Sequence, residues 1–263
     1  IGDRANREVL DVYEAVLAAH PAARDVRWRI EHAQHVDSAD LPRLARLGVI
    51  AAMQGVHCTS DGPWVPRRLG EARAHRTSYL WRSLLDSGAV VANGTDVPVE
   101  AIDPIANFYA SVSRRMADGE RFVPEQRMTR EEALRSYTLA NAFLGFEEAE
   151  KGTIAPGRLA DLAVLSRDIL TVPEEEILEA RVDLTVVGGR IAYRRAASSP
   201  VAPVSPGAGV STLPPGDWTL VSFDEGDPVP AGVAITARVE GSRLAGSAGC
   251  NRYFAQVEAR EGG

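Results

Sequence analysis

The chain has 263 residues, a formal net charge of −7, 45% hydrophobic residues and 25% charged residues, which is the composition of a globular protein with a sizeable core. This acidic balance argues against broad nucleic-acid binding, and no apolar run reaches the ~18 residues of a membrane span. The spacing of the two cysteines indicates neither a disulfide framework nor a zinc knuckle.

The sequence starts directly in a helical pattern. Its apolar residues at helical spacing are Val9, Leu10, Tyr13, Val16 and Leu17. Because the chain opens with Ile1 rather than Met, and ends soon after a strand-like stretch, we expect both ends to be cut from a longer protein.

Two predicted strands end at residues that can bind a metal. Apolar and charged residues alternate over 26–31, which predicts a strand that ends at His32, and residues 90–95 predict another before Asp96. The carboxyl ends of parallel strands are where α/β folds place ligands and metals. We therefore expect His32 and Asp96 to face a common metal-centred pocket.

A third strand is predicted between these two. Residues 41–47 have the pattern of a helix, and the apolar run 49–53 is typical of a parallel strand covered on both faces. Residues 55–76 resemble a long loop, which in a compact domain is usually a lid or a binding loop. Gln54 and His57 either face a substrate or are solvated, and both interpretations stay open.

Strands and helices then continue to alternate. Helices are expected over 78–85 and 105–116, and a capping box at Thr129–Glu132 opens a helix that runs to about Phe143. This alternation predicts a parallel sheet made of βαβ units. Three such strands fit best as the last part of a (β/α)8 barrel, which needs about 250 residues in total.

The pattern changes after Lys151. A strand over 161–165 and a hairpin around Gly188-Gly189 predict a small β module. Residues 196–216 are rich in Ala, Ser, Pro and Gly, which is typical of a linker. From Asp217 onward, short strands predict an all-β segment.

The first 195 residues resemble the amidohydrolase superfamily, in the branch related to N-substituted formamide deformylases. The motifs that carry this resemblance, in consistent order, are IGDRA at 1–5, RIEHAQ at 29–34, GVIAAMQ at 48–54, WRSLLDSG at 81–88, GTDVPVE at 94–100, REEAL at 130–134, Asn141-Ala142, KGTIAPGRLADL at 151–162 and VVGGR at 186–190.

The resemblance implies a metal-dependent hydrolase on a (β/α)8 TIM barrel, with a β-sandwich built from both chain ends. His32 matches the family's sixth-strand histidine and Asp96 its eighth-strand aspartate, whereas the family's other histidine ligands would precede Ile1. It therefore implies a divalent metal, with zinc favoured, bound by His32 and Asp96, and a catalytic role for Asp96. It assigns no substrate-binding residue.

The tail resembles a META domain, through Trp218, Leu220 and the run GSAGCNRY at 246–253. Such domains are common in bacterial envelope or secreted proteins, so the compartment stays open between the cytoplasm and the envelope or periplasm. The chain then divides into the C-terminal part of a barrel (1–150), a β-sandwich segment (151–195), a linker (196–216) and a partial META domain (217–263).

Plainer interpretations compete with each functional one. His32 can be a buried, hydrogen-bonded histidine, and Asp96 a turn carboxylate before Pro98. His20 and His75 have polar surroundings typical of the surface, and His35 is not predicted to be a ligand. Cys58 has no defined base partner in the sequence and is read as an ordinary thiol.

The leading hypothesis is a metal-dependent amidohydrolase that uses metal-activated water to hydrolyse a non-peptide carbon–nitrogen bond, in a small-molecule amide or formamide. An ester or a ring amide is an alternative substrate, and a homo-oligomer is left open. The competing hypothesis is a non-catalytic envelope protein with a degenerate barrel and a partner-binding META domain. The fragment alone is expected to be inactive, weak in metal binding and prone to aggregation, because its sheet edge is uncovered.

Overall fold

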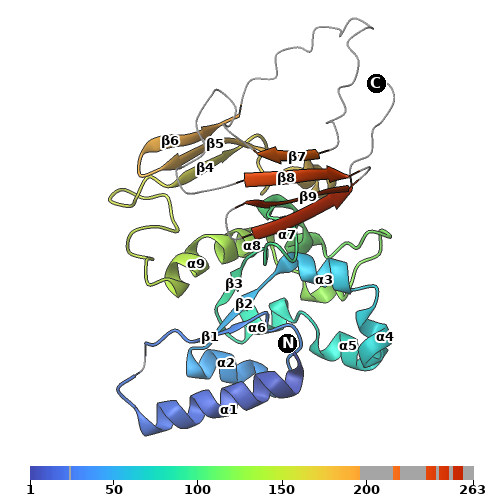
Figure 1. Ribbon diagram of the computed structural model, residues 1–263. Coiled ribbons are helices and arrows are strands. Elements are labelled where there is room, and N and C mark those ends of the chain that lie inside the picture. Colours follow the sequence, from blue (N-terminus) through green and yellow to red (C-terminus); the bar gives the residue numbers. More distant parts are fainter. Residues whose placement is uncertain (24, 196–215, 220–234, 241–242, 249–250, 257–263) are drawn as a thin grey trace, which may run out of the picture. The chain divides into compact units, whose positions relative to one another are not determined.

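The computed structural model describes residues 1–23, 25–195, 216–219, 235–240, 243–248 and 251–256. The chain divides into two compact units, Ile1–Ala196 and Ala197–Gly263 (Figure 1).

A three-stranded parallel sheet lies in the first unit. Its strands are β1 (Arg29–Glu31), β2 (Ile50–Met53) and β3 (Val91–Asn93), in the order β1-β2-β3. Every residue of β2 is buried, as predicted for a parallel strand that is covered on both faces, and every residue of β3 is buried as well. Because the strands are parallel, their carboxyl ends meet at one edge of the sheet.

Helices flank this sheet. They are α1 (Asp3–Ala19), α2 (Leu41–Leu47), α6 (Trp81–Asp86), α7 (Pro104–Ser113), α8 (Arg130–Tyr137) and α9 (Leu139–Leu144). Helix α2 lies beside β2 with α1 packed against α2, and α8 and α9 lie beside β3 (Figure 1). The predicted capping box is confirmed, since Thr129 Oγ1 accepts the Glu132 N–H at 3.2 Å.

The predictions for two segments were wrong. The expected loop over 55–76 contains three short helices, α3 (Gly55–Asp61), α4 (Val65–Leu69) and α5 (Glu71–Thr77). Each of these helices buries at least one residue in the core, although the sequence of residues 55–76 has no helical periodicity that predicts them. The helix expected to reach Phe143 is interrupted at Thr138, whose φ of −112° and ψ of −83° are not helical.

A second, antiparallel sheet follows within the first unit. Its strands are β4 (Leu162–Leu165), β5 (Val182–Val187) and β6 (Arg190–Arg194), in the order β4-β5-β6. Two short 3₁₀ helices lie between these elements in the chain: η1 (Pro124–Gln126) follows α7, and η2 (Glu174–Glu179) lies between β4 and β5. The predicted hairpin is confirmed, and its two glycines have positive φ of 56° and 76°, which suits the tight turn.

The described part of the second unit is a four-stranded antiparallel sheet. Its strands are β7 (Gly216–Thr219), β8 (Ile235–Glu240), β9 (Arg243–Ala248) and β10 (Asn251–Gln256), in the order β10-β9-β8-β7. The predicted linker, apart from Gly216, lies outside the described residues, and so does Cys250. Within the described ranges, no helix combines the length and the apolarity that crossing a membrane requires.

Candidate metal centre

Each strand of the parallel sheet ends close to a polar side chain. His32 directly follows β1, Gln54 directly follows β2, and Asp96 lies three residues beyond β3. The backbone turns sharply at two of these positions, because His32 has a φ of 69° and Asp96 a φ of 58°. A left-handed conformation costs a residue with a Cβ about 1–2 kcal/mol, and such conformations concentrate at functional sites.

His32 is oriented by Gln54. Its Nδ1 lies 2.9 Å from Gln54 Oε1. An amide oxygen can only accept a hydrogen bond, so when this bond is made Nδ1 carries the hydrogen and the lone pair lies on Nε2. A second hydrogen bond of this kind, on the ring nitrogen that does not bind the ion, is typical of histidines that bind metals.

Asp96 approaches this imidazole, so the structure brings the two predicted residues together. Asp96 Oδ2 lies 4.0 Å from His32 Nδ1, and the side chains are 32% and 31% exposed respectively. Both groups are therefore close to each other and reachable from solvent, as a site for an ion and a substrate requires.

His57 joins the pair, and the sequence did not single it out as a ligand. It lies on α3, its ring stacks on that of His32 with centroids 5.8 Å apart, and its Nε2 lies 3.6 Å from Asp96 Oδ2. His57 and Gln54 are both buried, so the solvated interpretation of these residues was wrong. Their position in the sequence could have indicated a role in the site, since both residues closely follow β2, the strand that pairs with β1 and β3.

The three side chains fit a divalent metal ion. Each offers one ligand atom, and these atoms all lie within 4.8 Å of one another. Among the described residues, the buried His57 Nε2 has no hydrogen-bond partner, although buried polar atoms nearly always have one. Two imidazole nitrogens and a carboxylate oxygen are donors that zinc and similar ions prefer.

The remaining histidines and the described cysteine lie outside this cluster. His20 and His75 are exposed, and His35 Nδ1 lies 3.0 Å from Ser78 Oγ. Cys58 is fully buried, and burial raises the pKa of its thiol to about 11. A thiol that remains protonated in the core is no nucleophile, in agreement with the interpretation from sequence.

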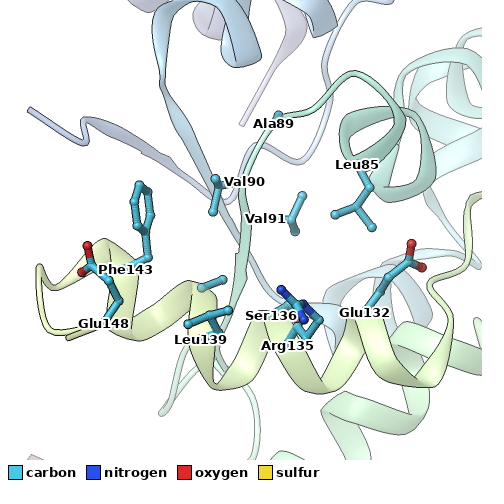
Figure 2. Close-up of a pocket in the computed structure, with 11 residues that line it drawn as sticks. Leu85, Ala89, Val90, Val91, Glu132, Arg135, Ser136, Leu139, Phe143 and Glu148 are labelled. Carbon is cyan, nitrogen blue, oxygen red and sulfur yellow. The ribbon is translucent and has the colours of Figure 1, made fainter. Parts of the chain in front are cut away.

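A separate, mainly apolar cavity of ≈ 330 Å³ lies beside β3 (Figure 2). It is lined by Leu85, Ala89, Val90, Val91, Glu132, Arg135, Ser136, Leu139, Ala140, Phe143 and Glu148. None of the three clustered residues lines it.

The fold and the site define an α/β protein with a candidate metal centre at the carboxyl edge of a parallel sheet. The profile of the amidohydrolase family matches residues 1–193, and the chain belongs to this family. The profile of the META domain matches residues 211–263.

Relatives match about three quarters of the chain. The chain is 37% identical over 194 residues to the protein LONG AFTER FAR-RED 3 of Arabidopsis thaliana, covering 73% of this chain and 33% of that protein. It is 32% identical over 198 residues to N-substituted formamide deformylase of Arthrobacter pascens, covering 75% of this chain and 36% of that protein. The chain thus spans about a third of the length of these curated relatives.

A solved structure shows the same fold. The crystal structure of an uncharacterized metal-dependent hydrolase from Pyrococcus horikoshii superimposes with a TM-score of 0.57 at 31% identity. The match covers 66% of this chain and 34% of that one.

Proposed function

We propose that the complete protein is a metal-dependent amidohydrolase that hydrolyses a non-peptide carbon–nitrogen bond in a small amide or formamide. The observation that carries the proposal is the convergence of His32, His57 and Asp96 at one edge of the sheet, with the buried His57 Nε2 left without a hydrogen-bond partner among the described residues. The family supports hydrolysis, and a relative named as a formamide deformylase supports this bond type.

His32 and Asp96 are the residues that hold the ion in this proposal, and zinc is the ion that best suits their donor atoms. Bound there, a divalent ion polarises a carbonyl group and makes a water-derived nucleophile available near neutral pH. The contact between Gln54 Oε1 and Nδ1 would hold the His32 ring in a fixed orientation.

Asp96 also moves the proton. Its carboxylate is about one-third exposed, so water and substrate can reach the oxygen atoms. In the proposed reaction, Asp96 accepts a proton from the attacking water and returns it to the leaving nitrogen. It acts first as general base and then as general acid.

His57 Nε2 lies 3.6 Å from Asp96 Oδ2 and has no hydrogen-bond partner among the described residues. A nitrogen in this place can bind either the ion or an oxygen of the substrate. Metal content separates the two roles, because replacing a ligand lowers the content whereas replacing a substrate-binding group leaves it unchanged. Measuring zinc in His57→Gln protein therefore assigns the role.

We also propose that the parallel sheet continues as a (β/α)8 barrel in the complete protein. In the described chain β3 pairs with β2 alone, so its other edge carries no partner strand. The apolar cavity lies along this strand, with Val91 of β3 opposite Leu85 of α6 and Leu139 of α9 (Figure 2). An apolar groove beside an open strand edge can be covered by additional strands and helices of the same protein. The relatives contain such additional chain, because this chain spans only about a third of their length.

The test is Asp96→Asn in the complete protein, assayed on N-substituted formamides, simple amides and matched esters. The variant is expected to keep its circular dichroism spectrum and to lose turnover. Asp118→Asn, which alters an exposed carboxylate that caps a nearby turn, is the control and is expected to keep turnover. Undiminished activity in Asp96→Asn refutes the assignment, and hydrolysis of the esters with none of the amides or formamides refutes the proposed bond type.

A further inference from the structure

Helix α3, which carries His57, begins on two side-chain amides from other elements. Asn93, the last residue of β3, accepts the Gly55 N–H at 3.0 Å through its Oδ1. Asn107, on α7, accepts the Val56 N–H at 2.6 Å through its Oδ1. The first N–H groups of a helix have no partner within the helix, so these two bonds fix where α3 starts.

The other end of the Asn107 amide reaches the Asp96 loop. Its Nδ2 donates a hydrogen bond to the carbonyl oxygen of Gly94, two residues before Asp96. Asn107 is 1% exposed. One buried amide therefore joins the residue next to His57 to the loop that presents Asp96.

There is little space in which α3 could shift. A Cβ on Gly55 would lie 2.2 Å from Ser111 Oγ and 2.6 Å from the Asn107 carbonyl oxygen. Ser111 Oγ accepts a hydrogen bond from Asn93 Nδ2 at 2.9 Å and donates one to the Asn107 carbonyl at 3.0 Å. Only glycine permits this approach of α3 to α7.

The carboxyl end of α3 is tied to the His32 loop. Asp61 Oδ2 accepts hydrogen bonds from the Tyr79 hydroxyl and from Gln34 Nε2, each at 2.6 Å. Gln34 lies two residues after His32. Burial, together with Asp61, raises the pKa of Tyr79 far above its usual value, so the hydroxyl remains a donor.

We infer that α3 is the positioning element of the metal centre and that Asn107 is the positioning residue that sets the separation between His57 and Asp96. This inference rests on the proposed function. Asn107 touches neither the ion nor the substrate in this account. It acts through the backbone on both sides of the site.

Loss of the amide releases both sides together. A hydrocarbon side chain of similar size leaves the Val56 N–H and the Gly94 carbonyl without partners, so the Asp96 loop and α3 can move apart. Residues that orient metal ligands typically change metal affinity by roughly 10- to 100-fold when replaced. The same range is expected for Asn107.

The experiment uses Co²⁺ as the probe ion in the complete protein. Dissociation constants are measured by chelator competition, and the visible absorption bands report the ligand geometry of the bound ion. Asn107→Leu is compared with Gln126→Met. Gln126 is a matched control because its amide also binds at both ends, accepting the Ser83 N–H at 3.0 Å and donating to Ser83 Oγ at 2.8 Å, away from the three clustered residues.

Asn107→Leu is expected to bind Co²⁺ about 10- to 100-fold more weakly than Gln126→Met, with altered absorption bands. Equal affinity and identical bands in the two variants overturn the positioning role while the proposed function stands. Absence of Co²⁺ binding in the wild-type protein overturns the proposed function and, with it, this inference.

A second variant applies if Asn107→Leu does not fold. Asn141→Leu removes a half-buried amide whose Nδ2 donates to the Asn93 carbonyl at 3.0 Å, at the outer end of the same network. A several-fold weaker affinity than in Gln126→Met supports the inference. Wild-type affinity and bands in Asn141→Leu overturn it.

Discussion

Substituting alanine at Gly55 is expected to destabilise the protein, although helix propensity alone predicts the opposite. Gly55 is the first residue of α3 and does not have a positive φ. At a free helical position, alanine is more favourable than glycine by roughly 0.5–1 kcal/mol. The structure leaves no room for the methyl group, so packing decides the sign.

The magnitude follows from the contacts. The added Cβ would lie 2.2 Å from Ser111 Oγ, 2.6 Å from the Asn107 carbonyl oxygen and 2.8 Å from Asn107 Oδ1. The hydroxyl can rotate, but the carbonyl belongs to the backbone of α7 and cannot. Overpacking of this kind costs about 1–3 kcal/mol, so after the gain in propensity we expect a net loss of about 1–2 kcal/mol.

Thermal unfolding of the complete protein measures this loss. At about 2–4 °C per kcal/mol, the conversion for a domain of about 150–250 residues, Gly55→Ala should lower the Tm by at most about 8 °C in the longer protein. Gly2→Ala is the control, since nothing lies within 4 Å of a Cβ at that residue. A Gly55→Ala protein at least as stable as the wild type would show that α3 is not seated against α7 as described.

Three further predictions concern the pH dependence of stability, thiol reactivity and the isolated chain. The Arg82 guanidinium holds the pKa of Glu132 at about 2, below its ordinary 4.5. The wild type should therefore have a free energy of unfolding roughly 1–2 kcal/mol higher than Glu132→Gln above pH 4.5, and this difference should vanish as the pH falls toward 2. Urea unfolding checks this, and a difference that is the same at pH 7 and pH 2.5 contradicts it. In a Cys250→Ser background, a thiol reagent at pH 8 should label Cys58 only after unfolding, because burial raises its pKa to about 11; rapid labelling of the native protein contradicts the burial. The isolated 263-residue chain should scatter light and bind Co²⁺ more weakly than the complete protein, and a stable, active monomer would show that the open edge of β3 is harmless.

The features that the sequence could predict are those that depend on a few neighbouring residues or on a position at the end of a strand. The capping box at Thr129 needs only its own four residues, and it formed as expected. The proximity of His32 and Asp96 follows from the geometry of parallel strands, whose carboxyl ends share one edge.

His57 could not be predicted in the same way. Its helix has seven residues, starts with glycine and shows no amphipathic repeat, so residues 55–76 had the pattern of a loop. What holds α3 in place is distant in sequence, because the Asn93 and Asn107 bonds join residues 38 and 51 positions apart. Tertiary hydrogen bonds therefore stabilise α3, whose local sequence has little helical propensity of its own.

The most direct measurement is anomalous diffraction at the zinc absorption edge from crystals of the complete protein grown with zinc. The account predicts a peak about 2.0–2.2 Å from a ring nitrogen of His32 and from a carboxylate oxygen of Asp96. A peak elsewhere in the molecule, or none at these residues with zinc in excess, contradicts it.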